Sequence, residues 1–115
     1  RGLPNSFMLL GPNTILDHSS VILMLEAQVE YMVRMICEAV DHDVASFEIK
    51  EKVMAKYSAW LEKRFAPRVS TESCGSWYTS SPGKNVAIWP STVRKFWQMT
   101  RGAPSLRRSY DVKYA

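Results

Sequence analysis

The chain has 115 residues, of which 46% are hydrophobic and 23% charged, and its formal net charge is +4. This length suits one small domain or a piece of a larger one, and the composition provides enough apolar side chains for a globular core. The longest uninterrupted apolar run, residues 21–25, is far shorter than the roughly 20 residues that a membrane-spanning helix needs.

The first expected element is a short apolar strand over residues 7–10, which a Gly-Pro turn ends. A polar loop follows, and a long helix begins near Ser19 or Ser20 and runs to about Val40. This helix is apolar all round its first two turns, so it needs a large surface to pack against. We therefore expect the chain to be a fragment of a larger protein.

Further elements follow in a mixed α/β order. We expect a strand at 44–49, an amphipathic helix from Glu51 to Phe65, and a compact β-like unit from residue 76 to residue 89 with a turn over 80–83. A last helix should start after Pro90-Ser91-Thr92 and end near Thr100. The remaining tail, 102–115, is expected to be irregular.

The two cysteines and the basic residues carry little functional information. Cys37 and Cys74 make no disulfide framework, so reduced thiols in a cytoplasmic protein are the favoured interpretation. The basic residues from position 92 onward could in principle bind nucleic acid or a membrane surface. Aromatic residues are not regularly interleaved among them, so we expect a solvated C-terminus that binds no nucleic acid. The basic residues in question are Arg94, Lys95, Arg101, Arg107, Arg108 and Lys113.

The most informative segment is the apolar run, loop and helix of residues 7–31. In α/β proteins, a strand followed by a tight loop and a helix N-terminus presents backbone N–H groups to an anionic or electron-rich ligand. The alternative is an ordinary strand–turn–helix junction, which every α/β protein contains.

The residue pattern of this segment resembles the closing strand, loop and helix of the FAD domain in flavin-containing and Baeyer–Villiger-type monooxygenases. That pattern reads GPNT-x-L-G-H-[NS]-S, followed by a helix containing E-x-Q-V. The matching residues here are Gly11, Pro12, Asn13, Thr14, Leu16, His18, Ser19, Ser20, Glu26, Gln28 and Val29. The family usually has glycine where this chain has Asp17, which brings a carboxylate toward a place that must accept negative charge.

The resemblance implies that this helix directs its N-terminus at the pyrimidine edge of the flavin, where reduction places negative charge. It implies FAD-binding roles for the residues of the loop and the helix start: Gly11, Pro12, Asn13, Thr14, His18, Ser19 and Ser20. His18 and His42 have no metal-ligand spacing, so we expect no metal site.

A second set of residues resembles the C-terminal segment C-x-S-W-Y, G-[RK]-N and W-P of the same enzymes. Here it reads Cys74-Gly-Ser-Trp-Tyr, Gly83-Lys84-Asn85 and Trp89-Pro90. In Baeyer–Villiger members this region includes a loop that folds over NADPH. The resemblance therefore implies NADPH contacts for Trp77 and Lys84. The alternatives are a packing anchor for Trp77 and a solvated turn residue for Lys84.

Taken together, the resemblance covers residues 3–101 and only the C-terminal part of such an enzyme, since the chain has no G-x-G-x-x-G fingerprint. We expect an α/β fold, part of a Rossmann-like flavoprotein with two dinucleotide-binding domains. Residues 1–43 would close the FAD domain, 44–101 would form a C-terminal extension with a cofactor lid at about 74–90, and 102–115 would be the tail.

The function implied is part of an FAD-dependent, NADPH-using monooxygenase that inserts an oxygen atom from O2 into a ketone or related carbonyl substrate. No catalytic residue is expected within this stretch, which should be inactive without the remainder of the enzyme. The alternatives are an N- or S-oxygenating flavin monooxygenase and a non-catalytic, truncated helical interaction module.

Overall fold

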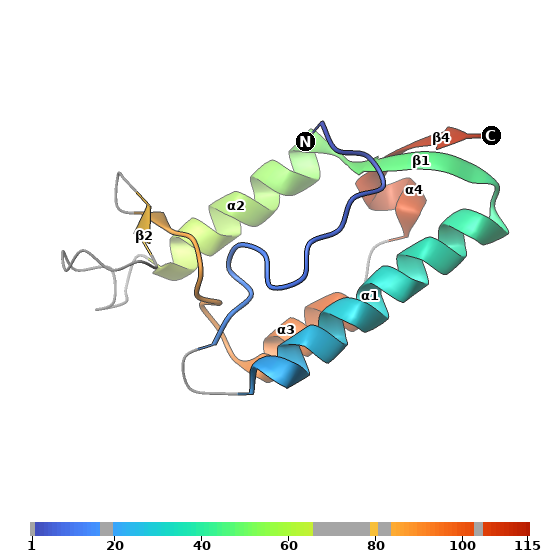
Figure 1. Ribbon diagram of the computed structural model, residues 1–115. Coiled ribbons are helices and arrows are strands. Elements are labelled where there is room, and N and C mark those ends of the chain that lie inside the picture. Colours follow the sequence, from blue (N-terminus) through green and yellow to red (C-terminus); the bar gives the residue numbers. More distant parts are fainter. Residues whose placement is uncertain (1, 17–19, 66–78, 81–83, 103–104) are drawn as a thin grey trace.

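The computed structural model describes residues 2–16, 20–65, 79–80, 84–102 and 105–115. These form a small α/β arrangement of helices and two-stranded antiparallel sheets (Figure 1). In chain order the elements are α1 (Val21–Asp41), β1 (Val44–Ile49), α2 (Glu51–Phe65), β2 (Thr79–Ser80), β3 (Lys84–Asn85), α3 (Val93–Arg101), α4 (Leu106–Ser109) and β4 (Tyr110–Tyr114).

The three long helices and β1 confirm the sequence prediction. Helix α2 begins and ends at the predicted residues. Helix α3 starts after Thr92, whose hydroxyl oxygen accepts a hydrogen bond from the Lys95 N–H at 3.2 Å. That bond satisfies one of the N–H groups that the first turn of a helix leaves without an internal partner.

The predicted strand at residues 7–10 is wrong. Residues 7–8 have no regular secondary structure, residues 9–10 form a turn, and Leu10 has a left-handed backbone with φ 51°. The Leu10 N–H donates to the side-chain oxygen of Gln28 in α1 at 3.0 Å, so an α1 side chain takes the place of a strand partner. A strand buried on both faces exists only between neighbouring strands, and in the described part of the chain no strand pairs with residues 7–10.

The expectation of an irregular tail is also wrong. Residues 106–114 form α4 and β4, and β4 pairs antiparallel with β1, with Val112 opposite Phe47. The signal was present in the sequence, because Tyr110, Val112 and Tyr114 alternate with charged residues, which is the pattern of a half-buried strand. The adjacent basic residues, Arg107 and Arg108, favoured the interpretation of this segment as an irregular tail.

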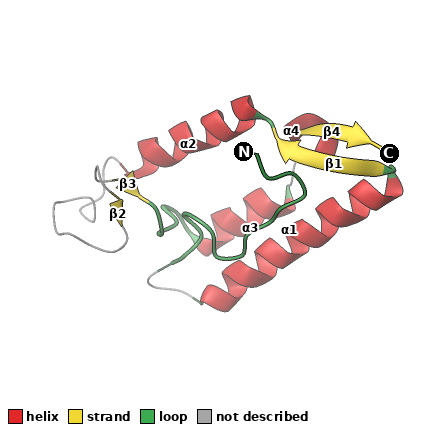
Figure 2. Ribbon diagram, turned by 45° about the horizontal axis from the view of Figure 1, so that its top comes forward, coloured by secondary structure: helices red, strands yellow, loops and turns green. Residues whose placement is uncertain are grey.

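Strands β2 and β3 pair on either side of the predicted turn, with Ser80 opposite Lys84. Residues 81–83 of that turn lie outside the described residues. Figure 2 shows this hairpin at the end of the molecule opposite the β1–β4 sheet. The predicted strand residues 76–78 lie outside the described residues. Of the predicted strand 86–89, only Ile88 forms a bridge, parallel to Ile15.

Helix α1 joins two small hydrophobic clusters instead of one continuous core. Its first half contributes Met24 and Ala27 to a cluster with Trp89 and Phe96, and its second half contributes to a cluster around β1 and α4. Arg34 of α1 donates its guanidinium N–H groups to the carbonyls of Thr100 and Arg101. A cation bound to the last carbonyls of α3 complements the dipole of that helix.

The opposite side of α1 carries a second apolar stripe, which this structure leaves exposed. We call it the outer face of α1, formed by Ile22, Val29, Val33, Ile36 and Val40. At 100° per residue these side chains lie far round the helix from the buried Met24 and Met35. The expectation that the first turns are buried all round is thus not met within the described residues, where Ile22 is 66% exposed. No helix among the described residues is long and apolar enough to cross a membrane.

Candidate functional site

The loop that leads to α1 turns sharply between Gly11 and Leu16. The Thr14 hydroxyl donates to the Gly11 carbonyl at 2.6 Å, and Asn13 has a left-handed backbone with φ 58°. A Cβ added at Gly11 would lie 3.4 Å from side-chain atoms of Met8, near ordinary contact distance. In this conformation it is therefore Asn13, and not Gly11, that occupies the backbone region unfavourable to most residues.

The structure brings together the two motifs that the sequence presents separately. The Asn13 N–H donates to the Val86 carbonyl at 3.0 Å, and its side-chain amide donates to the Ile88 carbonyl at 3.1 Å. The Ile15 N–H donates to Ala87 at 3.1 Å, and the Ile15 carbonyl accepts from Trp89 at 2.7 Å. We call this set of hydrogen bonds between residues 13–15 and 86–89 the loop junction.

Trp89 anchors the junction in the hydrophobic core. It is 1% exposed, and its ring centroid lies 5.4 Å from that of Trp60 and 5.1 Å from that of Phe96. Its indole N–H donates to the Thr92 carbonyl at 3.1 Å. A large aromatic ring held by two neighbours and a hydrogen bond has little freedom to move, so the segment that contains it is fixed against α2 and α3.

The N-terminus of α1 lies at the end of this loop. Ser20 is extended, with φ −63° and ψ 117°, and makes no side-chain capping bond among the described residues. The first turn, residues 21–24, contains no acidic side chain. Its N–H groups and the positive end of the helix dipole therefore suit a partner that carries negative charge. Asp17, His18 and Ser19 lie outside the described residues.

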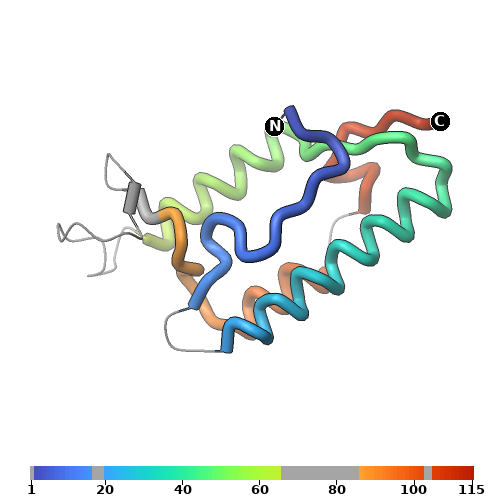
Figure 3. The backbone as a smooth tube through the Cα atoms, viewed as in Figure 1, coloured from blue at the N-terminus to red at the C-terminus, as the bar shows by residue number. Residues whose placement is uncertain are grey.

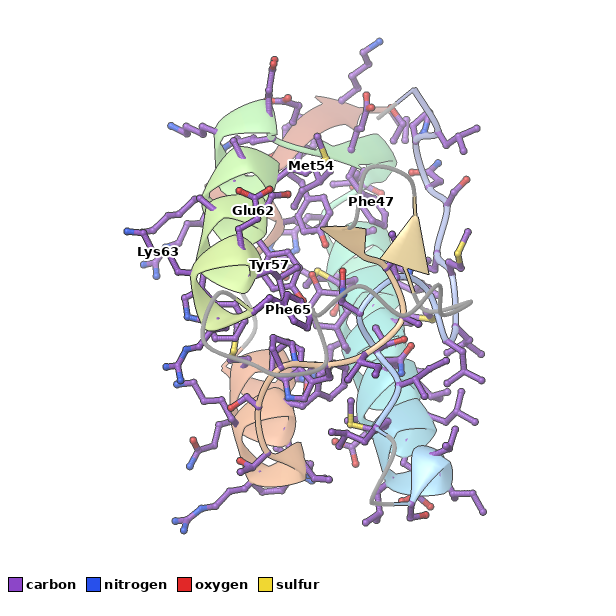
Figure 4. All side chains as sticks on the ribbon, turned by 90° about the vertical axis from the view of Figure 1, so that its left-hand side faces the viewer. Phe47, Met54, Tyr57, Glu62, Lys63 and Phe65 are labelled. Atoms are coloured by element: carbon purple, nitrogen blue, oxygen red, sulfur yellow. The ribbon has the colours of Figure 1, made fainter. Side chains whose placement is uncertain are left out.

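A cavity of about 470 Å³ lies between α1, α2 and residues 6–14. In Figure 3 the N-terminal segment crosses the space between these helices, and Figure 4 shows Tyr57 on the side of α2 that faces α1, whereas Lys63 points away. The lining is mostly apolar and includes Phe7, Met8, Met32, Met54, Tyr57 and Met99.

Two of the polar side chains at this cavity, Gln28 and Tyr31, are already bonded within the chain. Gln28 accepts from Leu10 and donates to the Met24 carbonyl at 3.0 Å. The hydroxyl groups of Tyr31 and Tyr110 form a hydrogen bond with each other. Burial and this bond raise the pKa of Tyr31 far above its ordinary value of 10.0, and burial raises that of Tyr110. Both phenols are therefore neutral at ordinary pH, and neither serves as a base.

The residues predicted to contact NADPH are not tested by the structure. Trp77 lies outside the described residues, and for Lys84 only the backbone, in β3, is described. Cys37 is exposed and unpaired, and no cluster of potential metal ligands occurs in the described residues. The predicted FAD contacts of Gly11, Pro12, Asn13, Thr14 and Ser20 remain predictions.

Two side chains that hold separate parts of the fold together are not singled out by the sequence. Gln28 was noted only as part of a motif, yet it holds the 8–10 turn against α1. The sequence analysis does not single out Arg34, which binds the end of α3. For Gln28, a single long polar side chain on the apolar side of a helix was the available signal, because a buried amide needs bonded partners.

Comparison with curated proteins finds monooxygenases that are similar in sequence to this chain. It is 34% identical over 102 residues to a Baeyer–Villiger monooxygenase of Pseudomonas aeruginosa, a match that covers 87% of this chain and 19% of the relative. It is 36% identical over 99 residues to the FAD-binding monooxygenase ktnD of Aspergillus niger, covering 82% of this chain and 16% of the relative. A Baeyer–Villiger monooxygenase of Streptomyces coelicolor is 31% identical over 102 residues, with coverages of 87% and 20%.

No protein-family model and no solved structure matches the chain. The chain spans about a fifth of the length of the curated relatives that it matches. Over most of its own length, this chain therefore belongs to the Baeyer–Villiger and FAD-binding monooxygenase family.

Proposed function

We propose that this chain forms the C-terminal part of an FAD-dependent, NADPH-using monooxygenase that inserts one oxygen atom from O2 into a carbonyl substrate. The similarity to relatives that are named Baeyer–Villiger monooxygenases carries this proposal. The geometry supports it, because the loop that resembles a flavin-binding segment leads to a helix N-terminus whose first turn lacks acidic side chains.

The residues near the start of α1 would hold the flavin. Backbone N–H groups of the first turn and of residues 18–20 would donate toward the ring edge that gains negative charge, and the helix dipole would stabilise that charge. Residues 11–14 would set the path of the loop and so the position of the helix start. When bound, FAD supplies the redox and oxygen chemistry, and the chain supplies position and a site that excludes water.

The outer face of α1 supports the proposal that the working enzyme contains much more than these residues. Its five β-branched side chains are between 44% and 71% exposed. An apolar stripe along the length of a helix is typical of a surface that another part of a protein covers. We assign the cover to the remainder of a flavoprotein with two dinucleotide-binding domains. In that enzyme, residues 1–43 would close the FAD domain, and Trp77 and Lys84 would contact NADPH in a lid at 74–90. The enzyme would act in the cytoplasm.

The reaction is tested with the natural full-length protein that carries residues 1–115. Purified protein is given NADPH, O2 and separate panels of ketones, sulfides and amines, and products are identified by mass spectrometry. Esters or lactones from the ketones support the proposal. Sulfoxides or N-oxides without any ester assign the protein to the heteroatom-oxygenating branch. No oxygenated product with any panel contradicts a monooxygenase and favours the non-catalytic interaction module.

A further inference from the structure

Asn13 lies at the centre of the loop junction. It is 6% exposed, its backbone is left-handed, and its backbone and side-chain amides both donate to carbonyls of residues 86–88. Asparagine is one of the few residues that accept this backbone conformation and also supply a side-chain donor. Glycine would supply only the conformation, and most other residues would supply neither.

The junction joins two parts of the chain that are distant in sequence. After residue 15 the chain leads to the N-terminus of α1, and before residue 86 it forms β3, which pairs with β2. The bond from the Asn13 side chain spans 75 positions of sequence. Trp89 is fixed in the core at the other end of the junction. Residues 86–88 are therefore anchored and cannot simply follow a displacement of the loop.

We propose that Asn13 is a positioning residue that couples the loop on the flavin side to the hairpin on the nicotinamide side. The assignment of the two sides rests on the proposed function, whereas the coupling itself rests on the hydrogen bonds. Asn13 acts through its hydrogen bonds to the carbonyls of Val86 and Ile88. When the loop changes position, the strength of these two bonds changes, and the change reaches the hairpin that precedes residue 86.

Hydrogen exchange of the natural full-length protein tests the coupling directly. Asn13→Gly permits the left-handed backbone and removes the side chain together with its bond to the Ile88 carbonyl. Exchange should become about five-fold faster in both segment 12–16 and segment 86–90, the effect of one lost hydrogen bond. Acceleration in segment 12–16 alone would overturn the proposal. If Asn13→Gly does not fold, Asn13→Asp serves, because it keeps the size and backbone preference and removes the donor.

Asn5 offers a matched control. It also has a left-handed backbone, with φ 57°, and its side-chain amide bonds distant backbone, donating to Ala45 and accepting from the Phe47 N–H, both at 3.0 Å. Asn5→Gly should accelerate exchange at residues 45–47 and leave segments 12–16 and 86–90 unchanged. Equal acceleration at the junction in this variant would mean general loosening and would overturn the specific coupling.

Addition of FAD separates the coupling from the proposed function. In the wild-type protein FAD should slow exchange in both segments. In Asn13→Gly, where the backbone bonds of the junction remain, FAD should slow segment 86–90 less than it does in the wild type. Slowing of segment 12–16 alone in the wild type overturns the coupling and leaves the flavin function standing. No slowing anywhere refutes the flavin function, while the coupling is still decided by the variants without FAD.

Discussion

Polar substitutions on the outer face of α1 should lower the free energy of unfolding once the remainder of the enzyme covers this face. Val33 lies in the middle of this face and is 51% exposed in the structure. Fully burying a valine side chain contributes about 1.5–3 kcal/mol, so covering the exposed half gives about 1 kcal/mol. The five side chains of the face together then contribute about 5 kcal/mol to the attachment of α1.

Val33→Asp should lower the free energy of unfolding of the natural full-length protein by about 3 kcal/mol or more, because it places an unpaired carboxylate in an apolar interface. On an uncovered helix the same change should cost less than about 0.5 kcal/mol, since the two residues have similar helix propensities. Urea titration followed by circular dichroism measures the difference.

Two control variants make this measurement specific. Val33→Ile keeps a β-branched apolar side chain and should change stability by less than about 1 kcal/mol. Lys56→Asp places the same carboxylate at an exposed position in the middle of α2 and should be nearly neutral. If Val33→Asp is as mild as Lys56→Asp in the natural full-length protein, the outer face is not covered and the assignment of α1 to an enzyme interior is wrong.

Three further predictions concern the core, the pH dependence and the lid. Trp89→Ala should destabilise the protein by about 3–5 kcal/mol in chemical denaturation, whereas Ala at the 43% exposed Trp97 should cost clearly less; equal losses would contradict the anchoring role of Trp89. The raised pKa values of Tyr31 and Tyr110 favour the neutral phenols in the folded state, so stability should hold below pH 10.0 and fall above it. Tyr31→Phe should make that alkaline fall shallower, and an unchanged slope would refute the argument. Trp77→Ala should raise the peroxide released per NADPH consumed and leave the flavin content unchanged; a loss of flavin instead would make Trp77 a packing residue.

The helices could be predicted because each depends on a local pattern. Residues 51–65 carry apolar side chains at helical spacing and end before a proline, so α2 was predicted to the residue. The β elements depend on partners that local patterns do not identify. Residues 7–10 have strand-like composition but lack a neighbouring strand in the described residues, and β4 finds its partner β1 more than half the chain away.

The candidate site shows the same division between local and distant signals. The loop and the start of α1 were recognised from a run of adjacent residues. The role of Asn13 in the junction could not be recognised from the sequence. Its partners Val86 and Ile88 lie in a distant segment, and only the fold brings them close to Asn13. Backbone carbonyls also carry no side-chain identity, so nothing in the sequence marks these two residues as acceptors.

The flavin content of the natural full-length protein tests the central claim most directly. The protein is purified with excess FAD, freed of unbound cofactor, and denatured, and the released flavin is identified and compared with the protein concentration. We expect about one FAD per chain, with the flavin absorbance of the folded protein shifted from that of free FAD. A protein that releases no FAD after this treatment would contradict the flavin site at the N-terminus of α1.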